Sequence, residues 1–175
     1  MPTFTCYTAP KKLTVPQKAE IANWCTDVYH EEFGIARYLI QVIFEEFASG
    51  DQYIAGQPAP DVVWIQCYVR AGRDEELKAR LLHRIQQGVA KTANVPEESV
   101  WFYLTDIPAM NIMEWGHIMP RPRPAETLEI VPITDPREVP HDDERWFESL
   151  SETFKARLRA LPTDAEFAST STETR

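Results

Sequence analysis

Hydrophobic and polar positions follow the same order twice along the first part of the chain. Apolar and polar residues alternate over Thr3 to Thr8, which is typical of a strand with one buried face. Thr14, followed by Pro16 and Gln17, indicates a helix start with a capping box. The segment RYLIQVIFEEF, residues 37–47, is rich in β-branched and aromatic residues and predicts a second strand, parallel to the first. Between these two strands, apolar residues recur at the spacing of a helix, at Ile21, Trp24, Cys25 and Val28.

A second copy of this pattern begins about sixty residues later. It predicts a strand over 62–69, a helix from about Asp74 to Thr92 and a strand over 99–105, and both copies carry Cys-Tyr in the early strand. The apolar stripe of this helix is Leu77, Leu81, Ile85 and Val89. The predicted fold class is α/β (α+β): tandem β-α-β units form a four-stranded mixed sheet with two helices on one face.

The composition changes after Ile118, which predicts a boundary near residue 120. Residues 1–120 form the tandem β-α-β domain, with a Gly/Pro-rich connector at 48–60 between its units. Residues 119–140 contain six prolines and predict an extended arm. A C-terminal helix is predicted over 144–161, before a polar, frayed tail, so 121–175 comprises arm, helix and tail. The apolar face of that helix is Phe147, Leu150, Phe154, Leu158 and Leu161.

Composition and charge exclude several classes of partner. The 175 residues, 43% of them hydrophobic, suffice for one globular domain with a real core. A formal net charge of −9 argues against nucleic acid and against anionic membranes, which bind clustered Lys and Arg. No apolar run approaches the ~20 residues of a membrane span, and the N-terminus lacks a signal-peptide pattern. The expected protein is soluble, intracellular and cytoplasmic.

Cysteine and histidine spacing gives no indication of a metal site. Cys6, Cys25 and Cys67 are odd in number, widely separated and set among apolar residues, so we expect reduced core thiols. The four histidines show neither CxxC nor HExxH spacing. We therefore expect no metal.

Pro2 has two interpretations. Proline is tolerated at the first residue of a strand, where a missing N–H costs little, and this is the simpler one. Chemically, removal of Met1 would turn Pro2 into a free secondary amine, a base that needs no side chain. If the two units meet about a pseudo-twofold axis, the start of the first strand lies beside the end of the third. Pro2 would then lie near Arg70 and Arg73, and the far end of strand 99–105, with Tyr103, would reach the same edge.

Each of these residues also has a structural interpretation. Arg70 and Arg73 could be solvated or pair with the acidic residues 74–76 that open the next helix. Tyr103 could be a core ring with its hydroxyl at the rim. Glu114 lies among Met, Ile and Trp, either turned to solvent or held in an apolar pocket that would raise its pKa and suit acid–base work.

Taken together, the N-terminal Pro, the doubled βαβ unit and the motifs RAGR, VWFYL and PAMNIMEWG resemble the tautomerase superfamily, specifically its cis-3-chloroacrylic acid dehalogenase-like branch. The resemblance covers Pro2 to about Pro120, and DERWFESLS resembles the tail of that branch. It implies a homotrimer with sheets around a threefold axis and no cofactor. It also implies roles: Pro2 as the catalytic amine, Arg70 and Arg73 as the pair that binds a substrate carboxylate, and Tyr103 with Glu114 as the pair that activates water.

One position departs from that branch. The dehalogenase has a substrate-binding histidine late in its first helix, and the ungapped match places Tyr29 there, whereas a shifted register would restore His30. Adjacent helical positions differ by ~100° in direction, so the two residues are not interchangeable. With Tyr29 in the pocket, efficient dehalogenation is in doubt, whereas hydration or tautomerisation survives. The proline-rich insertion after Arg121 is a second departure.

The leading hypothesis from the sequence is an enzyme that uses Pro2 for proton transfer on a small unsaturated or enolisable carboxylate. The reaction is either cis-3-haloacrylate dehalogenation or hydration, or enol–keto tautomerisation. Decarboxylation of a 3-oxo acid is a related alternative. A second class is a non-catalytic trimeric binding module of the same fold, which a retained Met1 would favour because an acylated nitrogen is no base.

Overall fold

The computed structural model describes residues 2–35, 37–59, 61–114 and 117–118, together with residues 152 and 156. Its main elements are β1 (Thr3–Thr8), α1 (Val15–Phe33), β2 (Gln41–Glu46), β5 (Val63–Arg70), α2 (Glu75–Ala93) and β6 (Val100–Ile107). Three 3₁₀ turns are η1 (Arg37–Leu39), η2 (Glu97–Ser99) and η3 (Ala109–Asn111). Two short hairpins pair β3 (Tyr53–Ile54) with β4 (Gln57–Pro58), and β7 (Met113–Glu114) with β8 (His117–Ile118).

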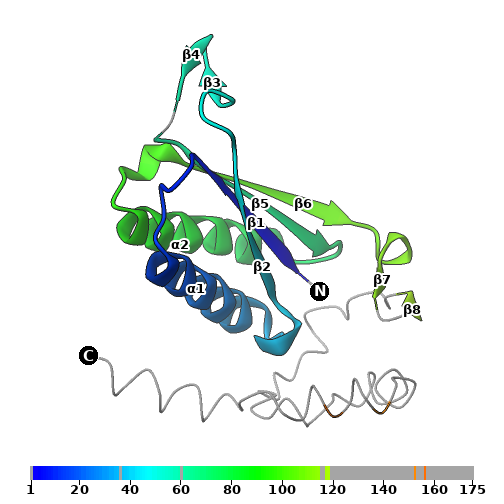
Figure 1. Ribbon diagram of the computed structural model, residues 1–175. Coiled ribbons are helices and arrows are strands. Elements are labelled where there is room, and N and C mark those ends of the chain that lie inside the picture. Colours follow the sequence, from blue (N-terminus) through cyan, green and yellow to red (C-terminus); the bar gives the residue numbers. More distant parts are fainter. Residues whose placement is uncertain are drawn as a thin grey trace.

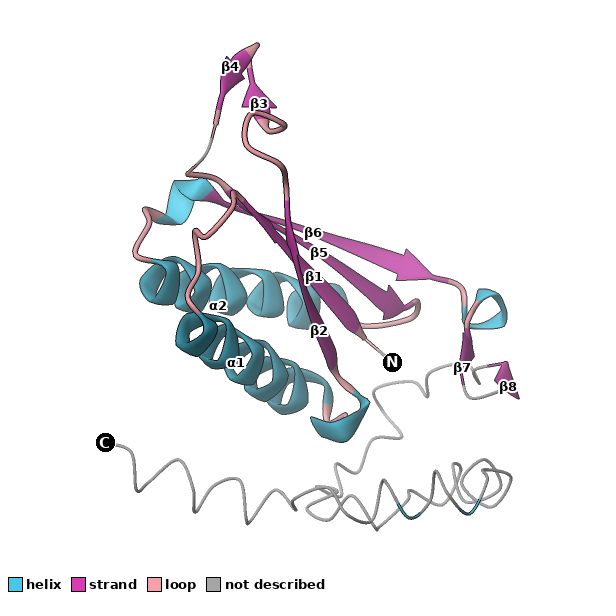
Figure 2. Cartoon of the chain, viewed as in Figure 1, coloured by secondary structure: helices cyan, strands magenta, loops and turns pink. Residues whose placement is uncertain are grey.

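The four main strands form one mixed sheet in the order β2-β1-β5-β6. β1 is parallel to β2, β5 is parallel to β6, and β1 and β5 meet antiparallel at the centre. Both long helices cover the same face of this sheet (Figure 2). The predicted tandem β-α-β fold is thereby confirmed, because each crossover returns its chain parallel to the strand it left.

The core lies between this face of the sheet and the two helices. It forms because buried residues alternate along each strand with residues that point to the opposite face. In β5 every second residue from Val63 to Val69 is buried, and the residues between them are half-buried on the opposite face. Phe4 and Cys6 of β1 turn to the same side as Val63 and meet α1. Three predicted stripe residues of α2, Leu81, Ile85 and Val89, are buried there as well.

Both helices begin at the predicted signals. Thr14 caps α1 with a capping box: its side chain accepts from the backbone N–H of Gln17, and the Gln17 side chain accepts from the N–H of Thr14. α1 ends at Gly34, whose φ of 63° is the left-handed C-cap that glycine adopts without strain. Asp74 caps α2 by accepting from the N–H groups of Glu76 and Leu77.

Three details differ from the prediction. The segment predicted as a strand over 37–47 opens with η1, and the ladder with β1 begins only at Gln41. The strands predicted to end at 69 and 105 run on to Arg70 and Ile107, because their parallel pairing continues that far. The connector at 48–60 holds the β3–β4 hairpin, whose turn residues Ala55 and Gly56 both have positive φ.

The predicted arm and the apolar face of the C-terminal helix, Phe147, Leu150, Phe154, Leu158 and Leu161, lie outside the described residues. Within 144–161 only Glu152 and Ala156 are described, and both are helical and exposed. The three cysteines are buried and free, as predicted.

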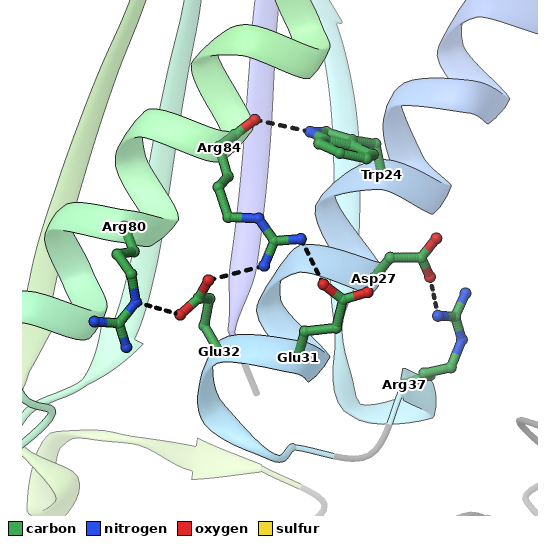
Figure 3. A network of polar contacts seen from close by, with 7 residues as sticks. All are labelled: Trp24, Asp27, Glu31, Glu32, Arg37, Arg80 and Arg84. Carbon is green, nitrogen blue, oxygen red and sulfur yellow. Dashed lines mark hydrogen bonds and ion pairs between the residues drawn. The ribbon is translucent and has the colours of Figure 1, made fainter.

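An ion-pair network joins the outward faces of α1 and α2 (Figure 3). Arg84 donates to both Glu31 and Glu32, and Arg80 donates to Glu32 over 3.0 Å. The Glu32 side chain is only 10% exposed. Its burial alone would raise its pKa, but the hydrogen bonds from Arg84 and Arg80 outweigh that effect and lower the pKa.

The lowered pKa of Glu32 gives a pH prediction. A carboxyl whose folded pKa lies below its unfolded pKa stabilises the fold fully above the unfolded pKa, near ~4.3, and loses this contribution as pH falls through the folded pKa. We therefore expect urea midpoints of the wild type and of Glu32→Gln to differ most at neutral pH and to converge as pH falls from about 5 to about 3. A difference that is constant over this range would contradict the assignment.

Gly88 leaves room for the Trp24 side chain between the two helices. A Cβ at this position would lie 2.0 Å from the indole nitrogen of Trp24, which donates to the Arg84 carbonyl over 3.0 Å. Alanine normally favours a helix over glycine by ~1 kcal/mol, but the clash should reverse that sign. We expect Gly88→Ala to destabilise the fold by about 1–3 kcal/mol in chemical denaturation. A smaller partner should relieve it, so Trp24→Leu combined with Gly88→Ala should lose less than the two single effects summed.

Candidate active site

The N-terminal end of β1 and the C-terminal ends of β5 and β6 meet at one end of the sheet (Figure 1). Thr3 pairs with Tyr68 in the antiparallel β1–β5 ladder, so Pro2 comes next, beside the final residues of β5. Pro2 is buried, and its carbonyl accepts from the N–H of Gln41 over 3.0 Å. This residue is therefore held by backbone pairing at the edge where β5 ends.

Arg70 and Arg73 lie at this end because β5 finishes there. Arg70 is the last residue of β5 and pairs with Ile107, and the next N–H, of Ala71, donates to the Ile107 carbonyl over 2.9 Å. A short connection then carries Arg73 to the N-cap of α2. Both arginines are half-buried. Two of the acidic residues that open α2 have contacts within the helix: Asp74 caps it, and Glu75 accepts from Lys78.

Aromatic contacts hold Arg73. Its guanidinium lies 5.3 Å from the centroid of the Phe33 ring, and its positive charge acts on the hydroxyl of Tyr29. Tyr29 is 1% exposed, with its ring edge-on to Phe4 at 5.9 Å and tilted against Phe33 at 4.7 Å. The aromatic contact of Arg73 restricts the directions in which its guanidinium can point.

Burial raises the pKa of Tyr29, and the positive charges of Arg73 and Arg70 only partly offset it. The phenol is therefore neutral at physiological pH. The charges of Arg73 and Arg70 thus both act on this one hydroxyl. The neighbouring His30 turns elsewhere: its Nδ1 lies 2.8 Å from the carbonyl oxygen of Ile35, in the loop that follows α1.

Glu114 comes from the segment beyond β6. The chain leaves Ile107, passes through Pro108 and η3, and enters β7, where Glu114 pairs with His117 of β8. Glu114 is half-buried, whereas the preceding Met113 is 68% exposed. Figure 1 shows β7 just beyond the end of β6, at the same end of the molecule as the N-terminus.

Tyr103 does not reach the same edge as Pro2, contrary to the sequence expectation. It pairs with Gln66 in the middle of β6, four residues before Ile107. It also lies on the sheet face away from the helices, where it is 52% exposed and contacts Trp64, whereas the buried Phe4 next to Pro2 faces α1. The expectation was wrong because β6 extends two residues further than predicted and strand alternation decides the face.

One charged residue at this end was missed from the sequence. Lys78 is buried in α2 and pairs with Asp106, near the end of β6. The signal was available, because Lys78 precedes Leu81 by three residues and so falls on the apolar stripe.

Within the described ranges, no group of three or more His, Cys, Asp or Glu residues could hold a metal ion. None of the helices in that part of the chain combines the length and apolar character that a membrane crossing needs.

Known proteins resemble the chain in fold and in sequence. A crystal structure of N1, a member of the cis-3-chloroacrylic acid dehalogenase (cis-CaaD) family, is 28% identical, covers 91% of this chain and 99% of its own, and has a TM-score of 0.72. A fused 4-OT asymmetric trimer is 20% identical, covers 66% of this chain and 94% of its own, and has a TM-score of 0.63. A fused 4-OT symmetric trimer is 22% identical, covers 67% of this chain and 94% of its own, and has a TM-score of 0.61. At that identity they show the fold alone. No curated protein matches the chain.

The family assignment rests on the sequence of most of the chain. A family model described as "Putative oxalocrotonate tautomerase enzyme" matches residues 1–132, which include Pro2, both arginines, Tyr103 and Glu114. The sequence motifs predicted the same superfamily, and the tandem β-α-β sheet agrees with it. The chain therefore belongs to this tautomerase family.

Proposed function

We propose that this protein is an enzyme that uses the amine of Pro2, freed by removal of Met1, for proton transfer on a small unsaturated or enolisable carboxylate. The observation that carries the proposal is the β1–β5 register: with Thr3 opposite Tyr68, the buried Pro2 lies beside the strand end that bears Arg70. In this proposal the start of β1 supplies the base, and the end of the antiparallel β5 beside it supplies a carboxylate-binding group.

In this proposal Arg70 and Arg73 bind the substrate carboxylate. Guanidinium groups match a carboxylate in fork geometry, and charge-assisted hydrogen bonds of this kind are the stronger ones. The two positive charges also draw electron density from an alkene conjugated to the carboxylate, which makes its β-carbon electrophilic. Tyr29 packs against the ring of Phe33, over which Arg73 lies, and so helps to fix the position of Arg73.

The protonation state of Pro2 selects between two reactions. An α-amine titrates near ~8, and burial and the nearby arginines disfavour its charged form. A cationic Pro2 gives its proton to the α-carbon while a water molecule, oriented by Glu114, attacks the β-carbon and leaves a proton on the Glu114 carboxylate. For a 3-haloacrylate the product is a halohydrin, which loses the hydrogen halide to leave the 3-oxo acid. A neutral Pro2 instead removes the enol proton and returns it to carbon, as in enol–keto tautomerisation.

The position of Tyr103 leads to a proposal about assembly. The sheet face away from the helices carries aromatic rings in mutual contact: Trp64 stacks on Tyr7 at 4.8 Å and meets Tyr103 at 5.9 Å. Trp101 is also 40% exposed and lies beside Trp64 in the parallel ladder. The fused 4-OT structures are trimers, and we infer that this aromatic face packs against other copies of the chain in a homotrimer. Tyr103 would then join Glu114 of another subunit at the interface.

Proton NMR of cis-3-chloroacrylate tests the hydrolytic reaction. Met1-processed protein is expected to form malonate semialdehyde or its hydrate, and the Pro2→Ala variant is expected to form it far more slowly. In parallel, the enol of phenylpyruvate tests tautomerisation by ultraviolet absorbance. Turnover of the enol alone would assign the protein to tautomerase chemistry. Turnover of neither, with Met1 uniformly retained by intact mass, would overturn the proposal in favour of a non-catalytic binding module.

A further inference from the structure

Lys78 is the charged side chain most deeply buried at the end of the sheet that holds the candidate site. The residue is 7% exposed and sits one turn inside α2. Its Nζ donates to Oδ2 of Asp106 over 2.5 Å and to Oε1 of Glu75 over 2.9 Å. A buried ammonium is tolerated only when it is paired, and these contacts pair it. Glu75 is largely exposed, so Asp106 is the partner that ties Lys78 to the sheet.

This ion pair spans the two segments that carry candidate site residues. Asp106 pairs with Val69, one position before the Ile107–Arg70 pair that ends the β5–β6 ladder. On the helix side, α2 begins directly after the connection that bears Arg73. On the sheet side, the chain continues from Asp106 through Pro108 and η3 to Glu114. The Lys78–Asp106 contact is therefore a side-chain tie between the start of α2 and the end of β6, in addition to the backbone bond from Ala71 to Ile107.

We propose that Lys78 is a positioning residue, whose bond to Asp106 fixes the segment bearing Glu114 relative to the connection bearing Arg73. The inference rests on the proposed function, because only that function gives the distance between the Glu114 segment and the Arg73 connection a catalytic use. The ammonium of Lys78 is buried, but the Asp106 side chain is 37% exposed, and an ion pair that reaches the solvent contributes little to stability, so stability alone does not account for this one. Its directional hydrogen bond fixes a distance that an apolar contact leaves loose. A displacement of about 1 Å at a reacting group can cost ~10²-fold in rate.

The test separates stability from positioning with three variants. Lys78→Leu leaves Asp106 without its ammonium and is expected to lower both the melting temperature and kcat. Lys78→Leu with Asp106→Leu replaces the ion pair by an apolar pair. This double variant should recover the melting temperature of the wild type to within a few degrees. Its kcat should nevertheless stay at least about 10-fold below that of the wild type. The matched control is Lys18→Leu, which removes a Lys–Glu46 ion pair of 2.9 Å at the other end of the sheet. It should leave kcat unchanged.

A second readout does not depend on turnover. Met110 and Met113 lie in the segment between β6 and Glu114, and the chain has only four methionines. With ¹³C-methyl methionine labelling, their resonances should shift in the double variant and stay in place in Lys18→Leu. Unshifted resonances, or a double variant with wild-type kcat, would overturn the proposal. The proposed function fails separately, if the wild type turns over neither probe. In that case the methyl shifts still test whether Lys78 positions this segment.

Discussion

Pro2→Ala is expected to lower kcat/KM for the substrate that the wild type turns over by at least about 10²-fold, the contribution typical of a positioned acid–base group. Alanine still provides an amine after Met1 removal, but a primary one. Its N–Cα bond rotates freely, whereas the pyrrolidine ring fixes φ and therefore the direction of the nitrogen lone pair. Steady-state kinetics on each variant, with intact mass to verify loss of Met1, measures the effect.

Two controls sharpen this result. Pro2→Leu places a large residue after Met1, which retains the methionine and removes the amine altogether, so no activity should remain. Pro10→Ala changes an exposed proline in the turn after β1 and should match the wild type. If Pro2→Leu with Met1 retained keeps full activity, the amine has no role and the proposed function fails.

Arg73→Ala is expected to reduce kcat/KM by about 10–10²-fold, mainly through KM. A charge-assisted hydrogen bond contributes ~1.5–3 kcal/mol, which corresponds to that range. Arg73→Lys should recover only part of the loss, because an ammonium retains the charge but lacks the planar fork. The matched control is Arg80→Ala, an arginine further along the same helix whose partner Glu32 keeps its bond to Arg84.

The oligomer should be the same in these arginine variants, by size-exclusion chromatography with light scattering. Tyr29→Phe removes only the hydroxyl on which the charge of Arg73 acts and leaves the ring contacts with Phe4 and Phe33. It should raise KM in the same direction as Arg73→Ala, but less. Unchanged KM in both Arg73→Ala and Tyr29→Phe would show that the carboxylate is bound elsewhere.

The fold followed closely from local sequence signals because each one acts over a few residues. Thr14, Pro16 and Gln17 predicted where α1 begins, and alternation over Thr3 to Thr8 predicted β1. The doubled pattern then left few ways to arrange two right-handed βαβ units in one sheet. Strand ends were less predictable: β6 continues to Ile107 because its partner β5 offers pairing there, which local sequence does not record.

The candidate site was predictable in part. That Pro2 lies beside the end of β5 follows from the antiparallel relation of the two units, which the repeat itself implied. The choice between Tyr29 and His30 as neighbour of the arginines could not be made from the sequence, because one residue of register along a helix changes the direction by ~100°. In the structure the ring of Tyr29 packs against Phe4 and Phe33, and Nδ1 of His30 lies near the Ile35 carbonyl in the loop after α1. Which of the two contacts the substrate stays a prediction.

The sequence by itself determined the elements, their order and the superfamily, since periodicity, capping residues and motifs are local properties of the chain. Only the tertiary structure decided which side chains share a face and a distance. The tertiary structure places Tyr103 in the middle of β6, on the sheet face away from the helices, and it pairs the buried Lys78 with Asp106. The physical reason is the same in both cases: strand register and helix–sheet packing bring together residues far apart in sequence, and no local pattern encodes that register.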